Sequence, residues 1–440
     1  MRKTGLLVAL MLALPVTTRA GEPFALAPGG DGVQRSPAAA HGGGVWLVVW
    51  QDGWSGDGGN SNIRGVLIGK GAVPGTPFTI CGAAGNQELP RVAAAKDGFF
   101  VAWQDYRGRR DADVYAAFVT RDGKVRHPKG IAVAEGAGTQ CHPDVGSNGA
   151  RCLVVWELAA GSKPCAIRAR RLDAAGRPAD PKPLSLGPGR SPAVTHGPSA
   201  GKYLAVWKSN AGRMRTVEGI LVPDAGLPGK PFTVMQVCSD APSVAAGENG
   251  FVVVASCRPA PNAWGWGGPA AFVFARVGLD GTAPDARVTY GYYNKELAAR
   301  SKTNILDSSQ WKRSPNIWPA GKVGGFPGTH DDRWPHLWSS IAPRGHGFVA
   351  VWVSRKIRNR WRLHDADLFG SGFTTDPVRV AKVGGAPVAT TEQNESRPQL
   401  ASDRSRLLLV YETVDAKGRL RVVGRWDAVR DGPPTPSSRQ

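Results

Sequence analysis

Four acidic residues follow short apolar runs that end in Trp or Tyr. They are Asp52, Asp105, Glu157 and Glu412. Two carboxylates about 5–10 Å apart could hydrolyse a glycosidic bond. A catalytic acid is needed once, however, whereas a loop cap is needed in every copy of a repeat. We therefore expect these acids to accept hydrogen bonds from loop N–H groups, and we assign no catalytic residue.

Asp105, Asp111 and Asp113 lie close together in the stretch "QDYRGRRDADV". Their carboxylates could ligate Ca²⁺, which takes about six to eight oxygen ligands. The spacing matches no EF-hand loop, and loop capping would explain the same residues. Calcium stays open as a cofactor, and no other metal or cofactor is expected.

Arginines stand shortly before Pro in several parts of the chain. They are Arg35, Arg190, Arg333 and Arg397. Because the guanidinium fork binds carboxylate or sulfate groups in a bidentate manner, several such residues around one opening would form an anion site. The alternative is that each Arg pairs with a neighbouring acid such as Glu88, Asp240 or Asp332.

Four Trp residues outside the repeated apolar runs are candidates for stacking on sugar rings. They are Trp54, Trp264, Trp266 and Trp334. Exposed aromatic platforms of this kind mark binding surfaces. The alternative is that they pack an irregular segment onto the rest of the protein.

Two pairs of Cys are placed for disulfides. Antiparallel pairing would bring Cys238 and Cys257 to the same end of one hairpin, and Cys141 and Cys165 stand in a similar relation. Cys152 begins a strand at the opposite end, so we expect it to be unpaired. No CxxC motif is present, which argues against a structural zinc site.

All of these residues are positioned by a repeat with a period of about fifty residues. Each unit has an Ala-rich strand that opens at a Pro, an apolar strand that ends in Trp or Tyr, and two further short strands. The Pro residues are Pro37, Pro90, Pro143, Pro192, Pro242, Pro335 and Pro398. The Trp position holds Trp50, Trp103, Trp156, Trp207, Ala255, Trp352 and Tyr411. Four antiparallel strands per unit predict an all-β, seven-bladed β-propeller.

The last unit ends near residue 428 without a fourth strand. The stretch "PFALA" at 23–27 matches the fourth strands "PFTIC" and "PFTVM", so we expect it to complete the last blade and close the ring. Residues 21–430 would form this single domain. The stretch 284–331 fits no blade and is predicted to be an irregular insertion, and 431–440 a disordered tail.

The whole mature chain resembles repeat proteins, common among exported bacterial sequences, whose units read Pro-x-Val-Ala, then Leu-Val-Val-Trp-x-Asp, then Asp-Gly. This resemblance implies a propeller and leaves the activity open. The Arg-x-Pro pattern also resembles the start of sialidase blades, where such an Arg holds the substrate carboxylate. Sialidase Asp-boxes of the form Ser-x-Asp-x-Gly-x-x-Trp are absent here.

The N-terminus has a basic start, a short apolar run and small residues up to Ala20, which predicts a signal peptide at 1–20 and a secreted or periplasmic protein. No later segment could span a membrane. The net charge of +20 favours anionic polysaccharide or an acidic cell surface over nucleic acid as partner in an exported protein.

Together these patterns predict a non-enzymatic binding protein that recognises a glycan or anionic surface polymer through one loop face. A polysaccharide-active hydrolase or lyase that uses acids of the same face remains an alternative. A structural propeller with a protein partner is the third possibility.

Overall fold

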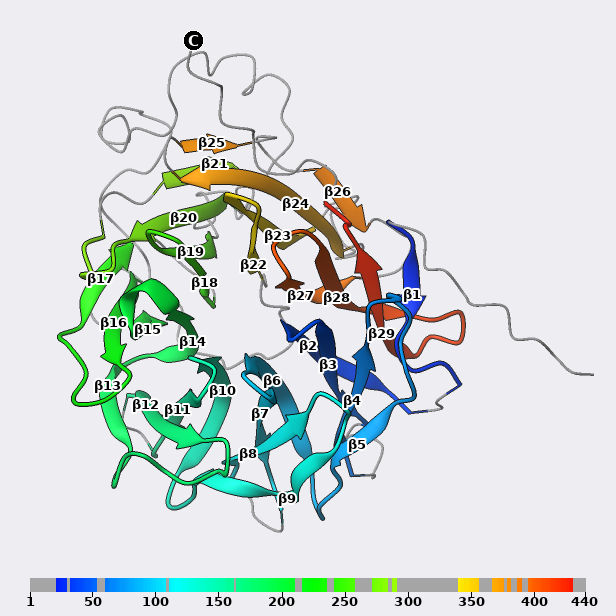
Figure 1. Ribbon diagram of the computed structural model, residues 1–440, viewed down its shortest axis with the longest axis horizontal. Helices are drawn as coiled ribbons and strands as arrows, with labels where there is room; N and C mark the ends of the chain where they lie inside the picture. The colour runs from blue at the N-terminus through cyan, green and yellow to red at the C-terminus, as the bar shows by residue number, and fades with distance from the viewer. Residues whose placement is uncertain are drawn as a thin grey trace, which may run out of the picture.

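Seven antiparallel sheets surround a central axis in the computed structural model (Figure 1). The structure describes residues 21–29, 32–53, 60–107, 111–161, 164–209, 216–235, 241–257, 271–283, 287–290, 339–355, 366–375, 378–380, 386–389 and 395–429. The fold is thus the seven-bladed β-propeller that the repeat predicts. The expected signal peptide and C-terminal tail lie outside these residues. Within them, no helix is long and apolar enough to cross a membrane.

The blades follow one another along the chain, and in each the first strand lies nearest the axis. Blades one to three contain β2 (Gln34–Gly42), β3 (Val45–Asp52), β4 (Asn62–Ile68), β5 (Phe78–Cys81); β6 (Gln87–Ala95), β7 (Gly98–Asp105), β8 (Asp113–Thr120), β9 (Val125–Ala134); and β10 (Thr139–Ser147), β11 (Arg151–Ala159), β12 (Ala166–Asp173), β13 (Leu184–Pro188). Blade four contains β14 (Arg190–Gly197), β15 (Lys202–Ser209), β16 (Thr216–Pro223) and β17 (Phe232–Met235), with a 3-10 turn, η2 (Pro198–Ala200), between its first two strands.

The remaining blades are built in the same way. They contain β18 (Ser243–Gly247), β19 (Gly250–Cys257), β20 (Ala271–Val277), β21 (Arg287–Tyr290); β22 (Ser339–Arg344), β23 (Gly347–Arg355), β24 (Ala366–Thr375), β25 (Val378–Val380), β26 (Ala386–Ala389); and β27 (Ser396–Ser402), β28 (Leu407–Val414), β29 (Leu420–Trp426), β1 (Pro23–Ala25).

The core lies between the blades. Seven hydrophobic clusters among the described residues each join two consecutive blades, the last of them joining blade seven to blade one. In β3, Trp46, Val48 and Trp50 pack toward blade seven, whereas Leu47 and Val49 pack toward blade two. A strand buried on both faces needs an uninterrupted apolar run, which explains why the second strand of each unit reads as it does.

The first strand closes the ring as the sequence predicts. β1 pairs with β29, and Phe24 faces Gly424 across the two strands. A Cβ added to Gly424 would come within 2.5 Å of the Phe24 ring, so glycine leaves the space that this ring fills. The guanidinium of Arg425 donates hydrogen bonds to the Gly21 carbonyl, which anchors the strand further.

Two details of the repeat differ from the sequence-based expectation. β21 completes blade five within the stretch that was expected to fit no blade, because its short "RVTY" segment carries no Gly or Pro to mark it. In blade six, Ser339 pairs with Trp352, whereas the Pro faces this Trp position in blades one and three. The alignment through Pro335, which made Arg333 equivalent to Arg35, is therefore wrong by four residues. Arg333 itself lies outside the described residues.

Candidate functional site

Five inner strands carry the same β-bulge directly before their Pro, in blades one to four and seven. At each bulge the residue before the Pro has a φ between 48° and 52°, and these residues are Ser36, Leu89, His142, Ser191 and Arg397. Positive φ is rare for residues other than glycine, and bulges redirect side chains beside functional sites. The bulges all occur where the inner strands begin, so they gather at one end of the ring.

At three of these bulges, the backbone N–H of the positive-φ residue donates a hydrogen bond to the residue that follows the Trp or Tyr of the preceding blade. Ser36 N donates to Glu412 Oε1 at 2.6 Å, and Ser191 N donates to Glu157 Oε2 at 3.2 Å. His142 N donates in the same way to Gln104 Oε1 at 3.3 Å. The two glutamates therefore act as hydrogen-bond acceptors for the backbone, as predicted, but they bind the next blade instead of their own loop.

Asp105 has the capping role predicted for it. It accepts hydrogen bonds from Trp103 Nε1 at 2.9 Å and from Arg107 N at 3.0 Å, and it forms an ion pair with Arg107 at 2.6 Å. Asp113 pairs with Asp105 across β7 and β8, and Asp111 is exposed at the neighbouring loop. Arg107 thus balances the charge of Asp105. Calcium binding at Asp105, Asp111 and Asp113 stays a prediction.

Arg190 and Arg397 pair with the same two glutamates. Arg190 Nη1 lies 3.6 Å from Glu157 Oε1, and Arg397 Nε lies 3.4 Å from Glu412 Oε1. The alternative of pairing with acids thus applies to both, although the acids are not the ones the sequence suggested. Arg91 lies 4.0 Å from Asp144 on the next inner strand.

Arg35 and Arg91, from blades one and two, lie near enough to Arg397 of blade seven for their charges to act on it. Burial lowers the pKa of Arg397, Glu412 opposes that shift, and the nearby charges of Arg35 and Arg91 lower it further. The side chains of Arg91 and Arg397 keep 30 % and 24 % of their exposure. The sequence did not single out Arg91, which directly follows Pro90, because it sits outside the Arg-x-Pro pattern.

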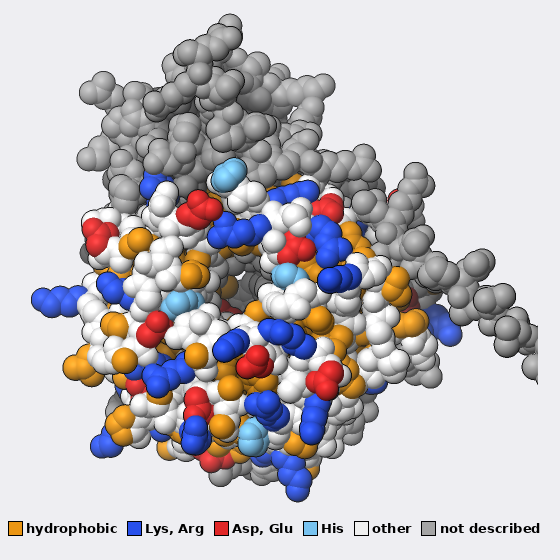
Figure 2. All heavy atoms as spheres, in the orientation of Figure 1, with side chains coloured by type: hydrophobic (Ala, Val, Ile, Leu, Met, Phe, Trp, Pro, Cys, Tyr) orange, Lys and Arg blue, Asp and Glu red, His pale blue; other side chains and the backbone are white. Residues whose placement is uncertain are grey.

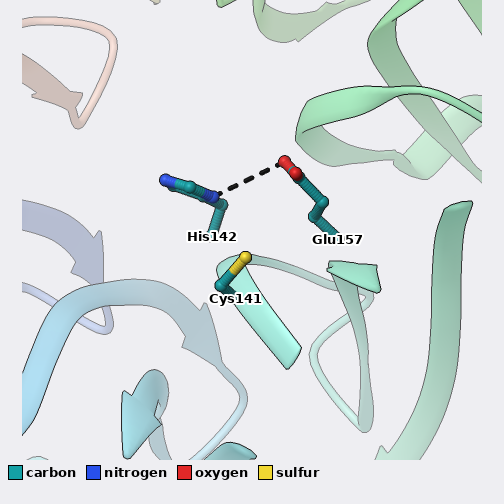
Figure 3. A group of neighbouring side chains, drawn as sticks. All are labelled: Cys141, His142 and Glu157. Carbon is teal, nitrogen blue, oxygen red and sulfur yellow. Dashed lines mark ion pairs between the residues drawn. The ribbon is translucent and has the colours of Figure 1, made fainter. Parts of the chain in front are cut away.

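Cys141, His142 and Glu157 form a compact group on β10 and β11 (Figure 3). Their thiol, imidazole and carboxylate ligand atoms all lie within 4.8 Å of one another. His142 Nδ1 is 3.5 Å from Glu157 Oε2, and Cys165, just before β12, hydrogen-bonds to the same carboxylate. Glu157 is 3 % exposed in its side chain, whereas His142 keeps 53 %. The group is therefore buried on one side and open on the other.

The electrostatics of this group differ from residue to residue. Burial, together with the charge of Glu157, raises the pKa of Cys141 to about 12. Burial also raises the pKa of Glu157, but His142, Ser191 N–H and Cys165 outweigh it, and the net pKa lies below its usual range. At neutral pH the site without a metal thus holds a carboxylate beside protonated thiols.

The disulfide predicted between Cys141 and Cys165 is not formed, and both thiols are free. Cys141 pairs with Glu157 on β11, and β12 lies on the other side of β11. Two strand spacings amount to about 9.6 Å, whereas bridged Cα atoms are usually about 4.4–6.8 Å apart. The sequence-based reasoning overlooked the intervening strand. Cys152 is free and buried, as expected, and the Cys238 and Cys257 side chains lie outside the described part.

The candidate Trp residues are not placed. Trp54, Trp264, Trp266 and Trp334 all lie outside the described residues, so their roles stay predictions. The described surface has a hollow at the centre of the ring in the view of Figure 2, with Lys and Arg side chains interspersed with Asp and Glu around it.

Sequence reasoning missed His142 and Glu157 as partners of Cys141. The signal available was positional: the residues before each Pro and after each Trp meet at one end of neighbouring strands. Cys141 and Glu157 form one such facing pair. Only the register reveals that Cys165 joins them from the far side of β11.

No protein-family model and no curated protein sequence matches this chain. Solved structures with similar arrangements include Trypanosoma rangeli sialidase in complex with sialic acid, with 10 % identity and a TM-score of 0.44 over 93 % of this chain and 58 % of that one. A puromycin hydrolase S511A mutant has 13 % identity and a TM-score of 0.47 over 88 % and 53 %. A thermostable family-43 glycoside hydrolase has 10 % identity and a TM-score of 0.33 over 61 % and 92 %.

The chain spans little more than half the length of the sialidase and the puromycin hydrolase. These similarities concern the propeller architecture alone, because a propeller supports many unrelated functions. Residues of this chain must therefore carry any argument about what it does.

Proposed function

We propose that this protein is an exported, non-enzymatic binding protein. It binds an anionic glycan or surface polymer at the end of the ring that carries the β-bulges. The observation that carries the proposal is that Arg397 lies near Arg35 and Arg91, which come from two other blades and whose charges add to the lowering of its pKa by burial. Like charges held together repel one another, and an anionic ligand would relieve that repulsion. Guanidinium groups also suit carboxylate and sulfate geometry.

Arg190 of blade four adds a fourth cation that can change partner. Its side chain is 39 % exposed, and its 3.6 Å separation from Glu157 is longer than that of a tight ion pair. The ion pair of a half-exposed guanidinium contributes little interaction energy, so little is lost when the guanidinium turns toward a ligand.

The test is binding of polygalacturonate and heparin, with neutral dextran as the comparison, by calorimetry at low and at physiological salt. We expect the double variant Arg35→Gln/Arg190→Gln to weaken anionic-polymer binding at least about tenfold. Arg177→Gln is the matched control, because Arg177 is 81 % exposed in a turn at the opposite end of β12. Equal binding by the double variant and the control would overturn the proposal, as would a wild-type protein that binds neither anionic polymer.

A polysaccharide-active hydrolase is the second candidate, supported by Asp144. Burial raises the pKa of this carboxyl to about 6, against the opposing effects of Arg91 and Val194 N–H. A carboxyl that is partly protonated near neutral pH can serve as a general acid. Glu157 and Glu412 are less suited, because their side chains are only 3 % and 4 % exposed, whereas that of Asp144 is 21 % exposed.

Release of reducing ends from the same polymers would test this second candidate. Activity that rises as the pH falls toward about 6 and disappears in Asp144→Asn would favour the hydrolase. If the wild-type protein binds the polymer but never cleaves it, the hydrolase is rejected and only the binding proposal stands.

A further inference from the structure

The group formed by Cys141, His142 and Glu157 offers a soft thiol, a borderline imidazole and a hard carboxylate ligand at one point (Figure 3). Each comes from a rigid strand, and the ligand atoms are mutually within 4.8 Å. We propose that this group binds a zinc-type transition-metal ion, and that Cys165, which hydrogen-bonds to Glu157 but lies outside the 4.8 Å group, moves closer to become the fourth ligand. Thiolate and imidazole ligands favour zinc over calcium or magnesium, whose ligands are oxygens.

The distances suit a small tetrahedral site. Zinc lies about 2.0–2.2 Å from nitrogen and oxygen ligands, so two such ligands in a tetrahedron are about 3.3–3.5 Å apart. His142 Nδ1 and Glu157 Oε2 are 3.5 Å apart. Cys165 reaches the site from the opposite side of β11, where its thiol already hydrogen-bonds to Glu157.

The surrounding charges also suit a divalent cation. Two thiolates and one carboxylate would carry three negative charges, and the metal with Arg190, 3.6 Å from Glu157, would supply three positive ones. Metal binding would displace the thiol protons, since thiolate is the form that ligates zinc. Ser191 N–H holds Glu157 Oε2 at 3.2 Å and orients the carboxylate from outside, as partners of metal ligands commonly do.

Blade seven provides the same backbone with different side chains. Ser396 and Arg397 occupy there the positions that Cys141 and His142 occupy in blade three, opposite Glu412 in place of Glu157. Both His142 and Arg397 adopt positive φ, at 50° and 48°. The bulge therefore tolerates Ser followed by Arg, and a variant that copies this pair into blade three should still fold.

The experiment uses the full-length mature protein, treated with chelator and kept reduced, and titrated with Co²⁺ in place of Zn²⁺. We expect one equivalent to produce the absorption of a tetrahedral thiolate site, and Zn²⁺ to displace it. Zn²⁺, but not Ca²⁺, should raise the midpoint of thermal unfolding, because it binds the folded state.

Three variants make the result specific. Cys141→Ser/His142→Arg, the blade-seven pair, should lose at least about 100-fold in affinity, since it removes two ligands. His142→Asn should weaken binding while keeping the fold, because Asn tolerates positive φ. Cys152→Ala, in the same blade but at the far end of β11, should bind as the wild type does.

The proposal is overturned if the reduced wild-type protein gives no Co²⁺–thiolate absorption, or if Cys141→Ser/His142→Arg binds as tightly as Cys152→Ala. A Cys141–Cys165 disulfide found by mass spectrometry, with no metal binding after its reduction, would equally overturn it. These outcomes are independent of polymer binding, which is measured separately.

Discussion

The junction between blades seven and one and the junction between blades three and four share one arrangement. In both, a glutamate after the Tyr or Trp accepts a hydrogen bond from the N–H of a positive-φ Ser in the next blade. Around Glu412 the neighbours are Ser396, whose hydroxyl donates at 2.8 Å, and Arg397. Around Glu157 they are Cys141, His142 and Cys165.

The comparison separates scaffold from specialisation. The carboxylate and the backbone bond recur, so they hold the ring together wherever they occur. The side chains beside the carboxylate do not recur: blade seven fills that space with a buried ion pair, and blade three fills it with metal-ligand types. In a repeat protein, functional residues are best sought at equivalent positions that hold different residue types in different repeats.

The largest expected effect is the loss of Glu412. Glu412→Ala leaves the mostly buried Arg397 without its acid and Ser36 N–H without its acceptor, and we expect a loss of about 3–5 kcal/mol in the free energy of unfolding. Glu157→Ala should lose less, about 1–3 kcal/mol, because Arg190 is more exposed and can be hydrated. Urea unfolding of both variants measures the difference.

A conservative variant sharpens that comparison. Glu157→Gln should retain most of the free energy of unfolding that Glu157→Ala loses. Glutamine can accept the N–H bond, as Gln104 does from His142. A larger loss for Glu157→Ala than for Glu412→Ala would contradict the assignment of the buried ion pair to blade seven.

A smaller effect is expected at the positive-φ serines. Ser36→Gly removes the hydroxyl that accepts a hydrogen bond from Arg397 and should lose about 1 kcal/mol. Ser191→Gly should change stability by no more than about 0.5 kcal/mol, because glycine accepts positive φ but has a more flexible unfolded state. Ser191→Val is the control for strain, with an expected loss of about 1–2 kcal/mol. Equal losses for the two glycine variants would contradict different roles for the two hydroxyls.

The smallest expected effect is a pH dependence at Glu157. Its folded pKa lies below its ordinary value of 4.5, so its charged form stabilises the fold above that value, and this contribution is lost as the pH falls through the folded pKa. The stability difference between the wild type and Glu157→Gln should therefore shrink from pH 7 toward about pH 3. Urea unfolding across this range tests it, and a difference that widens on acidification would contradict the lowered pKa.

The sequence predicted the ring better than the site. Trp50, Trp103 and the Ala-rich strands recur at a fixed period, and periodic burial can be read without coordinates. The closing strand at Phe24 was predicted because its fourth-strand motif was displaced to the start of the chain. The grouping of Cys141 with Glu157 depends instead on strand register, and the bulge shifts that register by one residue.

Errors in the prediction had local physical causes. Pairing Cys141 with Cys165 ignored that an intervening strand separates β10 from β12. The equivalence of Arg333 with Arg35 followed a Pro that does not occupy the repeated position. In both cases the position of a residue was inferred from a residue type, although only the hydrogen-bonded register of the strands determines it.

Ring closure by β1 has a consequence for how this chain becomes a folded protein. Phe24 is synthesised 400 residues before its partner Gly424, so the seventh blade cannot be complete until the strands of the other six have been made. Until then β29 has an unpaired edge that another chain could occupy. A protein shortened at either end would share the same defect, and exchange of first strands between two copies would be its natural route to association.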